Sequence, residues 1–122
     1  MCPVKIKIQI SHGKFIAFGP GKAQLLDAIN RYGSISGAAK SMNMSYKRAW
    51  DLVMVMNASF KEPLVITAVG GSHGGGAVLS LFGAEVLRHY LEIVEKSEKF
   101  VMSESDGFLS MLATQNDSDL IP

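Results

Sequence analysis

The chain has 122 residues, enough for one domain or for one domain followed by a tail. Hydrophobic residues make up 48% of it and charged residues 19%, which supports a buried core and excludes global disorder. No apolar run approaches the roughly 18–20 residues of a membrane span, and Lys5 and Lys7 interrupt the region where a signal peptide would be apolar. The single cysteine, Cys2, excludes a disulfide or a cysteine-based zinc site within one chain. We therefore expect a cytoplasmic protein.

The charged residues are distributed unevenly, although the net charge is only +1. Residues 1–61 contain nine lysines and arginines and two acids, a net charge of +7. Residues 62–122 contain three lysines and arginines and nine acids, a net charge of −6. Such asymmetry favours a surface that binds a polyanion, with the acidic half turned away. An ordinary solvated surface is the alternative, so a motif has to decide between the two.

The first part of the chain predicts a β-hairpin followed by a helix. Residues 4–10 alternate apolar and polar side chains, which is the period of a half-buried strand, and residues 14–18 return as a second strand. A break at residues 19–21 then precedes an amphipathic helix over residues 22–32.

The middle of the chain predicts two helices joined by a tight break. Ser34 suits the N-cap of a short helix through Met42, and Ser45 suits the N-cap of a helix that runs to about Ser59. The small residues 37–39 would allow the two helices to approach each other closely.

The second half predicts another hairpin and a long helix. Strands over residues 64–69 and 77–81 flank a glycine-rich segment, residues 70–76. A long helix follows over residues 82–102.

This order of elements predicts an α+β fold, a winged helix-turn-helix with an N-terminal β-hairpin and a long C-terminal helix. We expect residues 1–102 to form this domain and residues 103–122 to be a flexible tail or a helical extension. In this motif the first turn of the third helix enters the major groove of DNA. The predicted DNA-binding residues are Ser34, Ser36, Lys40, Ser45, Tyr46, Lys47, Arg48, Ser72, His73 and Gly74.

The chemistry of these residues suits a polyanion. Lys47 and Arg48 can reach guanine edges or phosphates, and hydroxyl groups such as that of Tyr46 can bond to phosphate oxygens. The alternative is that Lys47 and Arg48 are solvated helix charges and that His73 belongs to a simple hairpin turn. We interpret Trp50 as a core residue.

Three segments carry a resemblance to a known family. They are residues 33–40 (GSISGAAK), residues 44–51 (MSYKRAWD) and residues 70–79 (GGSHGGGAVL). Through them, residues 20–95 resemble the N-terminal DNA-binding domain of molybdate-responsive transcriptional regulators of the ModE type. The resemblance implies a sequence-specific regulator that binds double-stranded operator DNA as a homodimer and is linked to molybdenum transport genes. Members of this type continue into a molybdate-binding portion, and since this chain ends at Pro122 we expect no molybdate site in it.

The long helix has more apolar positions than one narrow stripe requires. One side would pack on its own domain and the other on a second chain, because paired half-sites on DNA favour a two-fold symmetric dimer. A single wide core face is the alternative. The predicted dimerisation residues are Val86, Leu87, Tyr90, Leu91 and Val94.

Other classes of function find little support in the sequence. The three histidines lack the spacing of metal ligands, and no nucleophile elbow or paired carboxylates are visible. The glycine-rich segment lacks the Gly-Lys-Ser/Thr ending of a phosphate-binding loop. We therefore expect no enzyme, no metal site, no cofactor and no membrane partner. The main alternative is a winged helix that serves as a protein-interaction module without DNA binding, which the basic turn at residues 45–48 disfavours.

Overall fold

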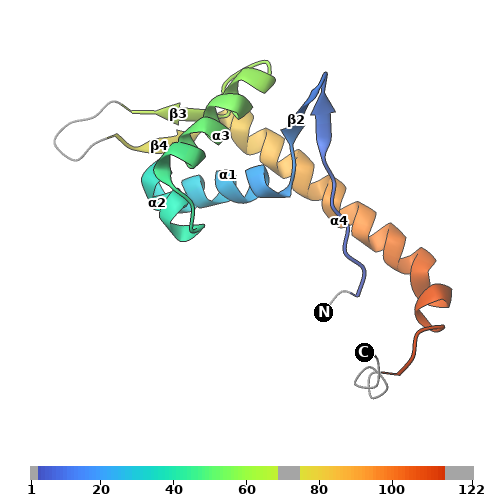
Figure 1. Cartoon of the computed structure of the whole chain (residues 1–122). Helices are drawn as coiled ribbons and strands as arrows, with labels where there is room; N and C mark the ends of the chain where they lie inside the picture. Colours follow the sequence, from blue (N-terminus) through green and yellow to red (C-terminus); the bar gives the residue numbers. More distant parts are fainter. Residues whose placement is uncertain (1–2, 69–74, 115–122) are drawn as a thin grey trace.

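The computed structural model describes residues 3–68 and 75–114. The elements follow one another as β1 (Ile10–His12), β2 (Phe15–Phe18), α1 (Pro20–Tyr32), α2 (Ile35–Ser41), α3 (Tyr46–Ser59), β3 (Val65–Thr67), β4 (Ala77–Leu79) and α4 (Leu81–Leu109). Helices α1 to α3 form a compact cluster, the β3–β4 hairpin projects from it as a wing, and α4 runs across it (Figure 1). The predicted α+β winged-helix fold is confirmed.

The first hairpin is shorter than the sequence pattern predicted. Strand β1 begins only at Ile10 and pairs antiparallel with β2, with a bulge between Ile10 and Ser11. The expectation of a strand from residue 4 is wrong, because residues 4–9 lie outside the sheet. Their alternation serves packing instead: Ile8 lies against the core, and its carbonyl accepts a hydrogen bond of 2.7 Å from the Tyr90 hydroxyl.

The turns between the three helices are set by local chemistry. Gly33 ends α1 at a φ of +73°, a left-handed conformation that glycine adopts without steric cost. The Ser34 side chain then caps α2 by accepting a hydrogen bond from the Gly37 amide. Asn43, also left-handed with a φ of +55°, turns the chain between α2 and α3. The predicted break and both predicted serine caps are therefore present.

The core lies where α1, α2 and α3 meet the two hairpins and α4. Small residues allow the close approach of α2 and α3, since Ala38 and Ala49 are completely buried. Aromatic rings extend the core toward the first hairpin, where Phe18 makes edge-to-face contacts with Phe60 and Tyr90. The largest completely buried side chains are those of Phe18, Leu25, Leu26, Ile29, Met56, Leu64 and Val53.

The wing is attached to the helices at its base. Strands β3 and β4 pair antiparallel with Ile66 opposite Val78. The amide of Ala77 donates to the carbonyl of Gly33 at 2.9 Å, which joins β4 to the turn after α1. On the other strand, the Asn57 side chain of α3 accepts hydrogen bonds from the Leu64 and Val65 amides at 2.8 and 3.1 Å. The wing is thereby held in a defined position relative to α3.

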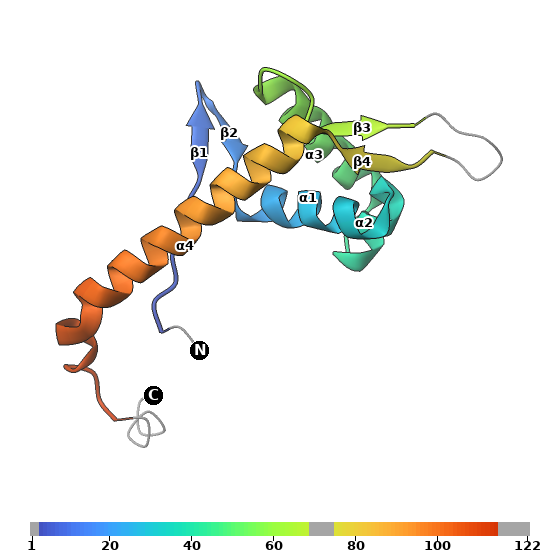
Figure 2. The same cartoon turned by 180° about the vertical axis from the view of Figure 1, so that it is seen from behind.

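Helix α4 begins at a close contact and extends beyond the domain. Ser80 caps it by accepting a hydrogen bond from the Gly83 amide at 2.8 Å. Gly83 lies so close to the chain that an added Cβ would be 2.1 Å from the Leu64 carbonyl oxygen. The helix continues to Leu109 instead of ending near residue 102. Its C-terminal end points away from the wing in both views (Figures 1 and 2).

The two glycines within α4 differ in their surroundings, and this predicts opposite effects of the same substitution. Gly83→Ala should destabilise the fold by about 1–3 kcal/mol, because the new methyl group overlaps backbone atoms of Leu64. Gly107→Ala should leave stability unchanged or raise it by up to about 1 kcal/mol, because nothing lies within 4 Å and alanine favours helix. Urea unfolding followed by circular dichroism measures both. Equal effects of the two substitutions would contradict the close contact at Gly83.

Asn57 is predicted to be the main polar link between α3 and the wing. Asn57→Ala removes the acceptor of two amides and should cost about 2–3 kcal/mol of unfolding free energy. Asn57→Asp keeps the accepting oxygen but replaces the amide that donates to the Val65 carbonyl with a second acceptor, so it should recover only part of this loss. The same urea titration compares the two variants, and a loss for aspartate as large as for alanine would argue against this role.

Candidate nucleic-acid interface

The first turn of α3 presents polar and basic side chains to solvent. Ser45 caps the helix by accepting a hydrogen bond of 3.1 Å from the Arg48 amide. Ala49, Val53 and Met56 bury the inner face of the helix, whereas Tyr46, Lys47 and Arg48 are exposed. The predicted constellation at residues 45–48 is thus gathered on one accessible turn.

A carboxylate shares this outward face. The Lys47 ammonium lies 3.1 Å from a carboxylate oxygen of Asp51, one helical turn later, and both side chains are more than half exposed. An exposed pair of this kind contributes at most about 1 kcal/mol. A phosphate can therefore compete for Lys47 at little cost. Asp51 also places one negative group on a face that is otherwise basic, a feature that sequence analysis did not assign.

The predicted residues at the N-cap of α2 and within it differ in exposure and in whether they border the same hollow as the first turn of α3. The Ser34 oxygen accepts from the Gly37 amide at 2.9 Å, so its first role is structural, although its hydroxyl hydrogen can still be donated. Ser36 is exposed and lines one hollow together with Tyr46. Lys40 is exposed near the end of α2 and does not line that hollow.

The predicted wing contacts are only partly described. Ser72, His73 and Gly74 lie outside the described residues, so their assignment stays a prediction. The described part of the wing does border the hollow at α3, through Thr67, Ala68 and the glycines at 75 and 76. The wing and the first turn of α3 therefore form one continuous surface.

Trp50 does not belong to the core, and the expectation that it would is wrong. Its side chain is 37% exposed, and that of Tyr46 is 53% exposed. The two rings stack with their centroids 6.2 Å apart and an angle of 23° between their planes. A helix turns about 100° per residue, which carries position 50 away from the buried face of Ala49 and Val53. Because position 50 lies at the margin of that face, only the packing of the other segments decides how exposed the ring is.

The opposite flank of α3 gathers further basic residues that sequence analysis did not select. Lys7, Lys22 and Arg48 line one hollow, although they come from the N-terminal segment, α1 and α3. The Lys22 ammonium donates a hydrogen bond to the Ile16 carbonyl. Partial burial of this lysine lowers its pKa by desolvation. No sequence spacing links these three residues, because only the fold brings them together.

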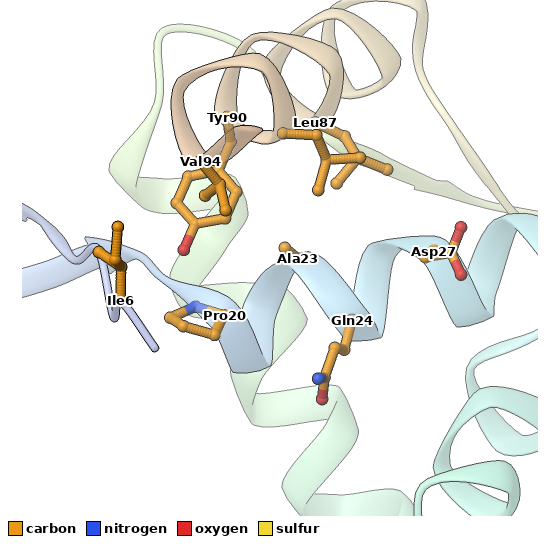
Figure 3. Close-up of a pocket in the computed structure, with 9 residues that line it drawn as sticks. Ile6, Pro20, Ala23, Gln24, Asp27, Leu87, Tyr90 and Val94 are labelled. Atoms are coloured by element: carbon orange, nitrogen blue, oxygen red, sulfur yellow. The ribbon is translucent and has the colours of Figure 1, made fainter. Parts of the chain in front are cut away.

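The predicted dimerisation residues fall into two groups. Leu87 and Tyr90 are buried in the chain's own core, and Val86 is half-buried against it. Leu91 is 51% exposed. Four of the five, Leu87, Tyr90, Leu91 and Val94, line an open groove of about 450 Å³ between α4 and α1, and the other lining residues are Ile6, Pro20, Ala23, Gln24 and Asp27 (Figure 3). Leu91 therefore offers more surface to a partner than Leu87 or Tyr90 does.

The described residues show no sign of two other kinds of site. No helix within residues 3–68 and 75–114 carries an apolar stretch long enough to cross a membrane. Over the same ranges, no three histidine, cysteine, aspartate or glutamate side chains gather in a way that suits a metal ion. Buried side-chain nitrogen and oxygen atoms in this part of the chain all have hydrogen-bond partners.

Comparison with known proteins finds similarity to proteins whose names describe regulators and molybdenum-related proteins. No model of a known protein family matches it. It is 42% identical over 90 residues to "Molybdenum transport protein ModE" of Azotobacter vinelandii, an alignment that covers 72% of this chain and 33% of that protein. It is 39% identical over 90 residues to "DNA-binding transcriptional dual regulator ModE" of Escherichia coli K12, covering 72% and 34%. Identity to "Molybdenum-pterin-binding protein MopB" of Rhodobacter capsulatus is 47% over 72 residues, covering 59% and 27%.

The chain thus spans about a third of the length of the curated relatives that it matches. The homology and the winged-helix fold agree with the three sequence segments that first indicated the family. The chain therefore carries a winged-helix domain of the ModE type, homologous to the N-terminal domain of these proteins.

Proposed function

We propose that this chain is a sequence-specific DNA-binding regulator of transcription that inserts α3 into the major groove. The observation that carries the proposal is the exposed basic turn at the start of α3, on a helix whose opposite face is buried in a winged-helix core. The printed name of the Escherichia coli relative, a DNA-binding transcriptional dual regulator, supports the same function.

The proposed contacts divide by chemistry. Lys47 and Arg48 reach guanine edges or phosphates, while Ser45 and Tyr46 bond to phosphate oxygens. Ser36 and Lys40 on α2 hold the neighbouring backbone, with a smaller part for Ser34. Ser72, His73 and Gly74 add further contacts to the DNA backbone. The excess of basic residues in the first half of the chain favours approach to the polyanion.

We further propose that two copies act together, with Leu91 at the centre of the interface. The two half-sites of a palindrome are related by a two-fold axis and suit a two-fold dimer, and the groove between α1 and α4 offers an apolar seat for a partner helix. The exposed apolar side chains further along α4, among them Ile93 and Phe100, would extend the contact.

The target genes are proposed from the relatives. The name "Molybdenum transport protein ModE" supports genes of molybdenum uptake as the regulated set. A regulator that binds bacterial DNA would act in the cytoplasm. Sites selected by this chain from random duplex DNA, with and without molybdate, would identify the operator and test the link. Enrichment of one palindromic sequence is the expected result, and no enrichment of any sequence would contradict specific recognition.

Removing the basic turn should weaken DNA binding. The double substitution Lys47→Ala and Arg48→Ala should lower affinity for duplex DNA at fixed salt. It should also reduce the slope of log affinity against log salt by about one unit for each phosphate group that the variant no longer binds. Fluorescence anisotropy of a labelled duplex at several salt concentrations measures both quantities.

The matched control changes the net charge by the same amount elsewhere. Lys96→Ala with Lys99→Ala removes two positive charges from α4, where Lys99 pairs with Glu95 far from the turn. This variant should retain the slope of the unsubstituted chain. Equal losses of affinity in both double variants would show that the loss depends on net charge and not on the position of Lys47 and Arg48. Failure of the unsubstituted chain to bind any duplex at low salt would favour a protein-interaction module.

A charge at the proposed interface should disrupt the dimer. Leu91→Glu places a carboxylate beside an apolar groove that already contains Asp27, and it should shift the chain to a monomer in sedimentation velocity. Leu81→Glu is the control, because Leu81 is the first residue of the same helix, is 93% exposed and does not line the groove. A monomeric unsubstituted chain, or dimers in both variants, would exclude this interface.

A further inference from the structure

Two aromatic rings on α3 are exposed without serving the core. Tyr46 and Trp50, which we call the aromatic shelf, stack on each other at 6.2 Å between ring centroids. Their side chains are 53% and 37% exposed. Neither ring belongs to the cluster of buried core residues. Exposed large aromatic side chains that do not support the fold are typical of binding surfaces.

The shelf lies between α3 and the base of the wing. It borders a hollow of about 310 Å³ that is also lined by Ile35, Ser36, Thr67, Ala68, Gly75, Gly76 and Ala77. No charged side chain lines this hollow among the described residues. The opposite flank of the same helix carries Lys47, Arg48 and Asp51. The outward face of α3 is therefore divided into an uncharged aromatic half and a charged half.

The position of the charged half on the DNA determines which groups of the major groove the aromatic half contacts. If α3 enters the major groove through its basic turn, the shelf enters the same groove on the side of the wing, with Tyr46 in that turn and Trp50 one turn along. Donors and acceptors dominate the base edges in that groove, and the thymine 5-methyl is the apolar group presented there. An aromatic ring has no hydrogen-bonding group on its face, so it gains from contact with that methyl group and not from contact with a cytosine edge.

We propose that the aromatic shelf of Tyr46 and Trp50 reads thymine 5-methyl groups in the major groove, with the Trp50 ring as the principal contact and the Tyr46 hydroxyl still available to bond to phosphate. This inference rests on the proposed function, since it needs α3 in the groove. It assigns thymine preference to a residue without charge, whereas Lys47 and Arg48 supply affinity and guanine or phosphate contacts.

Two duplexes that differ only in the methyl group test the proposal. Binding is measured by anisotropy on labelled duplexes, roughly two helical turns long, of alternating dA-dT and of alternating dA-dU, at one low salt concentration. The unsubstituted chain should bind the dT duplex about fourfold more tightly for each methyl group that the shelf buries. Trp50→Gln should lose this preference while still binding both duplexes, and Trp50→Phe should keep part of it.

A control on the same helix separates the shelf from general apolar surface. Val55 is 44% exposed on the flank of Arg48, so Val55→Gln should retain the dT preference. Thermal melts of the three variants show whether each is folded. Trp50 is also the sole tryptophan of the chain, so its emission should change on addition of the dT duplex.

The results distinguish failure of this inference from failure of the proposed function. Equal affinity of the unsubstituted chain for dT and dU duplexes would overturn the reading of methyl groups. So would a dT preference that survives Trp50→Gln or disappears equally in Val55→Gln. In these cases binding that still depends on Lys47 and Arg48 would leave the proposed function intact. Absence of binding to every duplex would overturn both.

Discussion

The geometry of this domain depends on the backbone of one buried residue, Leu64. Its amide donates to the Asn57 side chain of α3, and its carbonyl accepts from the Ser80 amide at 2.9 Å. Gly83, in the first turn of α4, lies so close to the same carbonyl that a side chain at this position would overlap it. The residue itself is completely buried. Because α3, β3 and α4 are all joined at this point, the position of the wing relative to α3 follows from it. A buried backbone group without such partners would be costly, which makes the junction strongly specified.

This junction explains why an exposed surface can have a defined shape. The outward face of α3 carries few contacts of its own beyond an exposed ion pair, and such pairs contribute little to stability. The position of α3 is determined by its inner face, where Ala49, Val53 and Met56 are buried in the core. A rigid scaffold that presents polar and aromatic side chains on a short helix suits recognition, since little ordering is required on binding. The same helix then presents its charged and aromatic halves at fixed positions relative to the wing.

Much of the fold was readable from the sequence because its signals are local. The caps at Ser34 and Ser45 and the stop at Gly33 each depend on residues within one turn of the chain. Small residues in α2 and the order of elements were enough to indicate the winged helix, and the basic turn at residues 45–48 stood out within it. The pattern of residues 4–10 was misleading for a physical reason. An alternating pattern of apolar and polar residues shows only which side chains are buried. Here Ile8 packs against the core, but residues 4–9 are not paired in a sheet.

The sequence by itself determined the elements, their order, the family and the candidate DNA-binding turn. Only the tertiary structure decided that Trp50 is a surface residue, that Lys7 and Lys22 lie with Arg48, and that Leu87 and Tyr90 belong to the chain's own core. The reason is the range of the interactions involved. Caps and turns are decided by neighbours in the sequence, whereas burial depends on which distant segments cover a side chain. That covering is produced by the packing of α1, α2 and β2 around α3 and of α1 against α4, and it has no counterpart in sequence spacing.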